Sequence, residues 1–165
     1  MLPNLIRISV FTVILLLSSC ATHNGLRPPL QLIDPSGFTA KQTDQILDLI
    51  NELNKEIGRD IIINSRADAS IFIKWRKEFP KQNPDSKVIT IGQATISKDQ
   101  CTIELSEWVT TDPDWLHTTL WHEIGHCFGL NHVSEEHQIM SSMATPFDEI
   151  ERAAIDLYIA ALRSK

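Results

Sequence analysis

Residues 122–132 read His-Glu-Ile-Gly-His-Cys-Phe-Gly-Leu-Asn-His, which is the spacing H-E-x-x-H-x-x-G-x-x-H. Residues four apart lie on the same face of an α-helix, so His122 and His126 can bind one metal ion together. Gly129 can end this helix, because glycine readily adopts the left-handed backbone of a sharp turn. The chain can then return and present His132 as a third ligand. Three protein ligands leave a fourth position for water, which is the open arrangement of a catalytic zinc rather than a structural one.

Glu123 directly follows the first of these histidines and is the candidate catalytic residue. Its carboxylate can reach a water on the metal without binding the metal itself, so it can act as a general base. The alternative is a buried amphipathic helix whose histidines have no metal-binding role. The long motif argues against this alternative, because it specifies a glycine and a third histidine beyond the common short form. We therefore expect one catalytic Zn²⁺ ion.

The composition indicates one globular domain that does not bind nucleic acid. The chain has 165 residues, of which 42% are hydrophobic and 22% charged, and its formal net charge is −6. These values are typical of a folded protein with a real core. Lys and Arg are not clustered, so the electrostatic footprint of a nucleic-acid-binding protein is missing. We place the domain at residues 30–165, and expect it to be a monomer.

The amino terminus has the pattern of a secretory signal peptide. Residues 1–19 contain Arg7 and an apolar run from Val10 to Leu17, which is too short to span a bilayer. The sequence Leu17-Ser18-Ser19-Cys20 then resembles a bacterial lipobox, in which the cysteine is lipidated. The alternatives are an ordinary signal peptide and an uncleaved anchor in which Cys20 has no role.

The lipobox resemblance implies an exported protein anchored to the cell envelope by its lipid. Residues 20–29 are polar and include two prolines, which suits a short tether. Ala21 follows the cysteine where an Asp would suggest retention in the inner membrane, so we expect the outer membrane in a cell that has two.

Periodicity and turn signals predict an α+β fold. Short apolar or alternating runs predict strands at 30–33, 60–64, 70–75, 88–96 and 101–109. A capping box at Thr39 and helical spacing up to Ile57 predict a long helix near the amino terminus. Asp112-Pro113 predicts the start of the motif helix. A last helix is expected from Pro146, with a buried face formed by Ile150, Ala154, Leu157 and Ala161.

Two further cysteines, Cys101 and Cys127, can form a disulfide outside the cytoplasm. Such a bridge would join the motif helix to the strand that Cys101 opens. The alternative is a pair of separate buried thiols, since spacing alone does not show that the two Cα atoms are close enough.

The long histidine motif, followed by Met140 eight residues after His132, resembles the metzincin metalloproteases and most of all their matrixin branch. The resemblance covers the chain from about Leu30 to Leu162, and is specific only from His122 to Met140. It implies a twisted mixed β-sheet with a long N-terminal helix, an active-site helix and a C-terminal helix. It also implies that Met140 forms the apolar floor of the zinc site, a position that fits Met143 less well.

The same resemblance implies a zinc endopeptidase that acts on extended protein or peptide segments. The strand at 88–96 would be the edge strand of the cleft, and the backbone of Gly92, Gln93 and Ala94 would pair with the substrate. Two alternatives stay open. One is a zinc-binding surface lipoprotein without activity, and the other is a zinc amidase that acts on cell-wall peptides.

Overall fold

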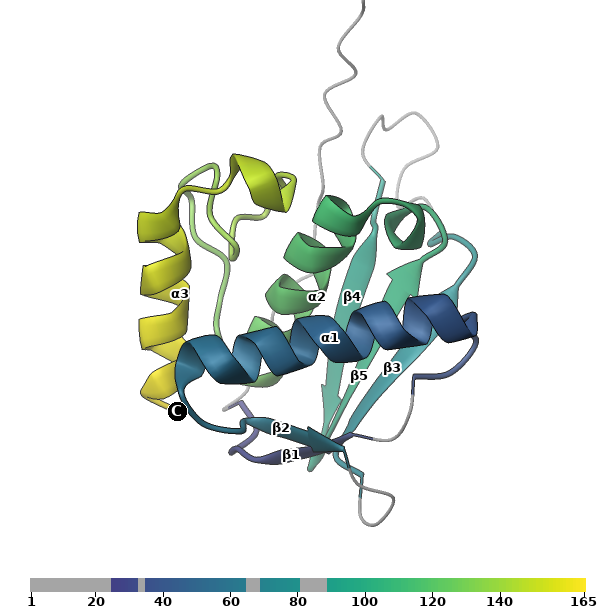
Figure 1. The fold of residues 1–165 in the computed structure, drawn as a ribbon, viewed down its shortest axis with the longest axis horizontal. Coiled ribbons are helices and arrows are strands. Elements are labelled where there is room, and N and C mark those ends of the chain that lie inside the picture. The colour runs from purple at the N-terminus through teal and green to yellow at the C-terminus, as the bar shows by residue number, and fades with distance from the viewer. Residues whose placement is uncertain (1–24, 33–34, 65–68, 81–88) are drawn as a thin grey trace, which may run out of the picture.

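A five-stranded β-sheet is the framework of the molecule in the computed structural model (Figure 1). The structure describes residues 25–32, 35–64, 69–80 and 89–165, so Cys20 and the predicted signal peptide lie outside the described residues. The described strands are β1 (Leu30–Leu32), β2 (Ile62–Asn64), β3 (Ile71–Arg76), β4 (Gly92–Ser97) and β5 (Gln100–Ser106). Their order in the sheet is β2-β1-β3-β5-β4. β4 pairs with β5 in the antiparallel sense and the other neighbours are parallel, so the sheet is mixed, as predicted.

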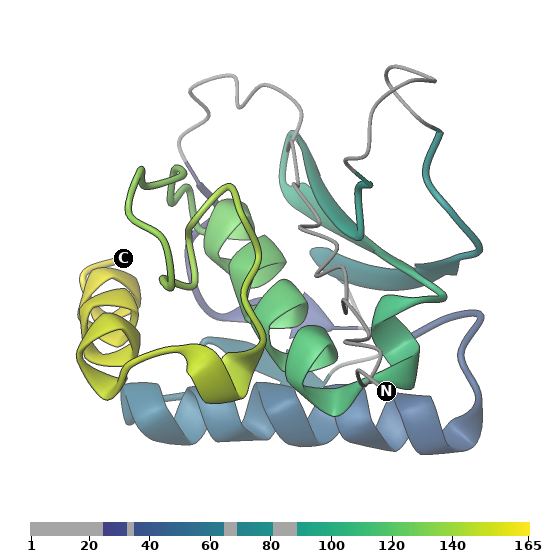
Figure 2. The same ribbon diagram turned by 90° about the horizontal axis from the view of Figure 1, so that it is seen from above.

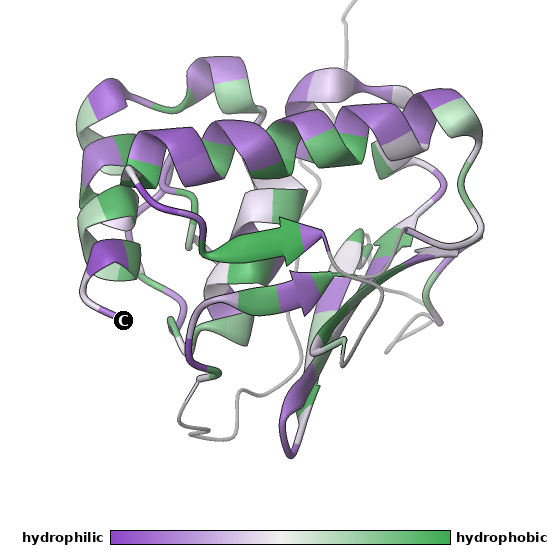
Figure 3. Ribbon diagram, turned by 60° about the horizontal axis from the view of Figure 1, so that its bottom comes forward, coloured by the Kyte–Doolittle hydropathy of each residue, from purple (hydrophilic) through white to green (hydrophobic). Residues whose placement is uncertain are grey.

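The described helices are α1 (Ala40–Ile57), α2 (Pro113–Cys127) and α3 (Arg152–Arg163), with short 3₁₀ turns η1 (Val109–Thr111) and η2 (Phe147–Glu149). Figures 1 and 2 show α1 crossing α2, with α3 at one end of α1. The predicted capping box is present, since Thr39 and Gln42 bond each other's backbone N–H groups. Hydrophobic and hydrophilic residues alternate along α1 in Figure 3, as expected of a helix with one buried face.

The central element is α2, which carries the histidine motif. Asp112 caps it by accepting hydrogen bonds from the backbone N–H groups of Asp114 and Trp115, and Pro113 occupies the first turn. Nearly every residue of α2 from Leu116 onward is buried. A helix that is buried on almost all sides needs neighbours all round, and α2 contacts β4, β5, α1 and η2. The metal motif is therefore held by the most enclosed part of the fold.

The prediction for the last helix is wrong in its start and, apart from Ile150, which is buried, in its buried face. Residues 147–149 form η2, Ile150 is extended, and α3 begins only at Arg152. The buried residues of α3 are Ile155, Tyr158, Ile159 and Leu162, whereas Leu157 is 63% exposed. The sequence of this helix contains two overlapping series of apolar residues at helical spacing. The series with the larger side chains, which includes Ile155, Tyr158, Ile159 and Leu162, is the one that packs against the core.

Strand boundaries also differ from the prediction, by one or two residues at β2 and β3 and by more at β4 and β5. β5 ends at Ser106 instead of 109, because the Thr110 and Thr111 hydroxyls donate to the carbonyls of Glu107 and Trp108 and favour a turn. β4 begins at Gly92, later than the predicted start.

Among the described residues, no helix is both long and apolar enough to cross a membrane.

Candidate metal centre

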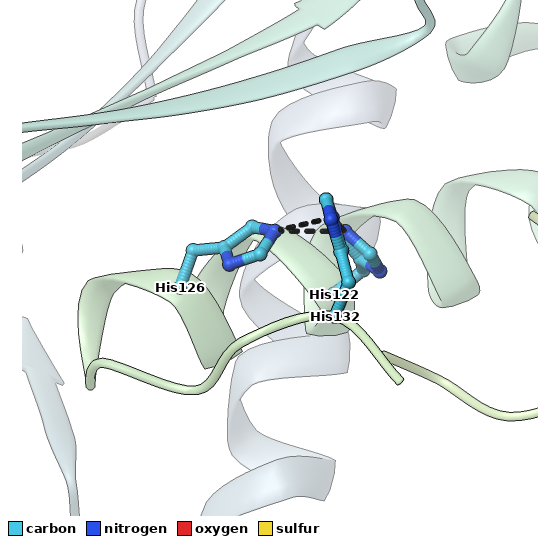
Figure 4. Close-up of side chains that lie close together, drawn as sticks. All are labelled: His122, His126 and His132. Atoms are coloured by element: carbon cyan, nitrogen blue, oxygen red, sulfur yellow. Dashed lines mark hydrogen bonds between the residues drawn. The ribbon is translucent and has the colours of Figure 1, made fainter. Parts of the chain in front are cut away.

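His122, His126 and His132 converge on one point, as Figure 4 shows. Their Nε2 atoms are separated by 3.0 Å for His122 and His126, 3.1 Å for His126 and His132, and 3.3 Å for His132 and His122. Nitrogen ligands about 2.0–2.1 Å from a tetrahedral zinc lie about 3.3 Å from one another. The three nitrogen atoms therefore stand close to the spacing that one tetrahedral ion requires.

Hydrogen bonds to backbone carbonyls set the tautomers of two ligands. His122 Nδ1 lies 2.6 Å from the Ile139 carbonyl oxygen, and His126 Nδ1 lies 2.8 Å from that of Leu130. A carbonyl oxygen only accepts, so each Nδ1 carries a hydrogen and each Nε2 presents a lone pair. Lone pairs that face each other at 3.0 Å repel unless a cation lies between them. The residues present therefore fit a bound metal ion.

Burial keeps these histidines neutral, which is the form that binds metal. Desolvation and, to a smaller extent, the neighbouring His126 and His132 lower the pKa of His122 to about 3, although the hydrogen bond to Ile139 opposes the change. Desolvation also lowers the pKa values of His126 and His132. At neutral pH all three imidazoles are therefore available as ligands.

The third ligand is delivered by a turn that the sequence predicted at Gly129. This residue has a φ of 77°, the left-handed conformation that glycine adopts without strain. The loop that follows is tied down by a 2.9 Å hydrogen bond from the Val133 N–H to the Met140 carbonyl. His132 is therefore held between two fixed points of the backbone.

Met140 is buried, and its side chain lies against α2 at Gly125. A Cβ added to Gly125 would lie 2.5 Å from Met140 Sδ, so the glycine leaves the space that the thioether fills. The residue before it, Ile139, supplies the carbonyl that orients His122. Met143 is only partly buried, and its N–H donates to the Ser141 hydroxyl. The segment around Met140 thus supports the metal centre from outside the histidine motif.

Glu123 is buried beside the three histidines and is 1% exposed. The Ala94 N–H donates a hydrogen bond to its carboxylate, and Oε2 has no hydrogen-bond partner among the described residues. Burial raises the pKa of Glu123 to about 8, although the bond from Ala94 opposes the rise. A metal cation nearby would favour the ionised form. A carboxylate so placed can exchange a proton near neutral pH.

A pocket opens beside His122 and Glu123 and contains residues that the motif did not identify. Its walls include Ile91, Gly92, Thr118, Thr119, Ser142 and Ala144. Thr118 and Thr119 lie four and three residues before His122, so the helical period places them on the ligand face of α2. That period could have identified both threonines from the sequence. Ala144 could not be placed, because its position depends on the loop after Met140.

The remaining predicted residues lie around this centre. Gly92, Gln93 and Ala94 open β4, the edge strand next to α2. Cys101 and Cys127 form a disulfide with a Cα–Cα distance of 5.7 Å, which joins the start of β5 to the end of α2. Both cysteines are fully buried.

Comparisons with known proteins identify the fold and no more. No protein-family model matches the sequence, and no curated protein sequence matches it. The structure is similar to archaemetzincin from Methanopyrus kandleri, with a TM-score of 0.51 and 14% sequence identity over 86% of this chain and 97% of that chain. Metalloproteinase-II from Bacteroides fragilis gives a TM-score of 0.49 and 14% identity over 85% of this chain and 54% of that chain. The first of these likenesses shows a metallopeptidase-like fold.

Proposed function

We propose that this chain is a zinc-dependent endopeptidase of the metzincin type, with a matrixin-like active site. The observation that carries the proposal is the convergence of His122, His126 and His132 within 3.3 Å, with the buried carboxylate of Glu123 on the next residue. The fold shared with archaemetzincin supports the metzincin type. The eight-residue step from His132 to Met140 supports the matrixin-like branch.

The proposed reaction is hydrolysis of a peptide bond. His122, His126 and His132 would hold the zinc ion, which would supply Lewis-acid chemistry toward water and the scissile carbonyl. Glu123 accepts a proton from the attacking water, whose oxygen forms a bond to the carbonyl carbon. The carbon–nitrogen bond then breaks, and Glu123 returns the proton to the leaving amine. Oε2 of Glu123, which has no hydrogen-bond partner in the part of the chain that the structure describes, gives the carboxylate an atom for this exchange.

The proposed substrate is an extended segment of protein or peptide. β4 is an edge strand, and an edge strand offers backbone groups with which a further strand can pair. The pocket beside His122 would receive one side chain of that segment. A folded substrate would have to expose a loop in order to bind in this way.

Replacing Glu123 by Gln tests the proposal. The purified chain should contain one zinc ion per molecule and cleave a denatured protein, while Glu123→Gln should retain the zinc and lose at least about 10³-fold in kcat. The measurements are metal content and the rate of peptide release. If both proteins bind zinc and neither cleaves, the result would favour the alternative of a zinc-binding protein without activity. Release of cell-wall peptides in place of protein fragments would favour the amidase.

We also propose that the chain is exported and anchored by a lipid on Cys20. The support is the lipobox-like sequence at 17–20. Fractionation of cells that express the chain should place it in the membrane fraction, and Cys20→Ser should release it from that fraction. An unchanged distribution would reject the lipid anchor.

A further inference from the structure

The outer edge of β4 faces the carboxylate of Glu123. The Ser106 N–H donates to the Ile91 carbonyl, which marks these two opposed residues as a hydrogen-bonded position of the antiparallel ladder. Successive pairs alternate in such a ladder, and Gly92 with Leu105 and Ala94 with Ile103 are therefore pairs without hydrogen bonds. The backbone groups of Gly92 and Ala94 point away from β5. The Ala94 N–H points in this direction and donates a hydrogen bond to the carboxylate of Glu123.

Gly92 leaves the space into which that carboxylate fits. A Cβ added at Gly92 would lie 2.8 Å from Glu123 Oε1 and 3.1 Å from its Cγ. It would also lie 2.5 Å from Cγ2 of Thr119, one turn earlier on α2. All of these atoms are buried, and side chains in a packed core move only at a cost. Any side chain at position 92 must therefore displace Glu123, Thr119 or the strand.

We propose that Gly92 is a positioning residue for Glu123: the absence of a side chain lets the edge strand approach α2 and hold the carboxylate in one orientation. This inference rests on the proposed function, in which Glu123 moves the proton. It assigns β4 a second role besides any pairing with substrate. The Ala94 N–H orients the carboxylate, and the missing Cβ of Gly92 leaves room for it.

A stability cycle tests the contact without any assay of activity. Gly92→Ala should lower the midpoint of thermal unfolding by roughly 5 °C or more in the chain that has Glu123. Both chains of the cycle carry Thr119→Ser, which removes the Cγ2 contact. In the one that also carries Glu123→Ala the same substitution should change the midpoint by less than about 2 °C, because Oε1 and Cγ of Glu123 are then gone as well. Equal shifts in the two backgrounds would overturn the proposal. Unfolding is measured with the metal removed, so that binding of zinc does not enter the comparison.

Kinetics then test positioning, with Thr119→Ser as the matched control. Gly92→Ala should keep one zinc per molecule and lose about 10²-fold in kcat, with KM changed by less than about twofold. Thr119→Ser removes the Cγ2 contact, so Gly92→Ala/Thr119→Ser should show the same loss if Glu123 is the residue displaced. Wild-type kcat in Gly92→Ala, or recovery in the double variant, would overturn the proposal.

A wild-type chain that holds zinc and cleaves nothing would instead refute the proposed function, and the stability cycle would still report the contact.

Discussion

His117 is a buried histidine on α2 that does not belong to the metal centre. Its ring stacks on Phe147 with centroids 3.4 Å apart, and it meets Trp121 edge-on at 4.5 Å. Its Nε2 has no hydrogen-bond partner among the described residues, and the carboxylate of Glu52 is 3.9 Å away and half exposed. Burial lowers the pKa of His117 to about 4. A screened carboxylate at that distance does not compensate for the lost hydration of a charged ring.

This environment predicts an acid-sensitive contribution to stability. The unfolded chain binds a proton at His117 below its ordinary pKa of 6.5, whereas the folded chain binds it only below about 4. The free energy of unfolding should be fully maintained above pH 6.5 and should fall by about 1–3 kcal/mol as the pH drops toward 4. His117→Phe keeps the stacked ring but cannot titrate. Chemical denaturation at several pH values should show the difference between the two proteins shrinking or reversing between pH 6.5 and 4. A difference that is independent of pH would refute the assignment to His117.

The sequence predicted some residues of the site better than others. His122, His126, His132 and Glu123 follow from spacing, because their geometry depends on one helix and the turn that ends it. Gly92 was predicted as one of the backbone positions that pair with the substrate, and the sequence could not identify Glu123 and Thr119 as its neighbours. That information depends on the packing of β4 against α2, which a local pattern does not contain.

At the scale of elements, α2 and the segment around Met140 form one support for the metal centre. Gly125 is the point of closest contact, since a Cβ there would meet Met140 Sδ at 2.5 Å and the Tyr158 ring at 3.1 Å. The same segment carries the Ile139 carbonyl, 2.6 Å from His122 Nδ1. A shift of this segment would therefore move a metal ligand.

Gly125→Ala tests this link between the two elements. In an isolated helix the substitution would stabilise by about 1 kcal/mol, because alanine has the higher helix propensity. Here we expect the opposite sign, together with a zinc affinity about 10–100-fold weaker, because the carbonyl partner of His122 is displaced. Competition with a chelator measures the affinity. The same substitution in a Met140→Ala background should have a much smaller effect, and an equal effect in both backgrounds would show that Met140 is not the cause.

The buried face of the last helix was predicted wrongly because tertiary contacts decide it, whereas α1 was predicted from local signals. The long helix α1 was predicted correctly because its cap, its period and its terminal Gly58 all agree. The last helix contains two overlapping apolar stripes, and only contact with α1 and α2 selects the one that includes Tyr158. The Tyr158 hydroxyl donates to the Trp121 carbonyl on α2, which is a tertiary contact that the sequence pattern does not reveal.

At the scale of the whole molecule, the site is assembled from segments that are far apart along the chain. Glu123 and the ligands come from α2 and the turn after it, the carbonyl on His122 comes from Ile139, and the strand that contacts Glu123 comes from β4. A covalent link crosses this assembly, since the disulfide of Cys101 and Cys127 connects β5 to the end of α2 beside His126. The bridge therefore joins the sheet directly to the element that carries the metal.

Removing the bridge should destabilise the fold without impairing catalysis. The two cysteines are 26 residues apart, and closing a loop of that length reduces the conformational entropy of the unfolded chain. Replacing both by Ala should lower the free energy of unfolding by about 3–4 kcal/mol, and the midpoint by roughly 10 °C. The loss should be the same in metal-free and zinc-loaded protein if it arises in the unfolded state. We expect kcat at a temperature well below the midpoint to stay within about twofold, because the packing of α2 on β4 and β5 still positions the ligands. Loss of zinc at that temperature would instead show that the bridge holds α2 in place in the folded protein.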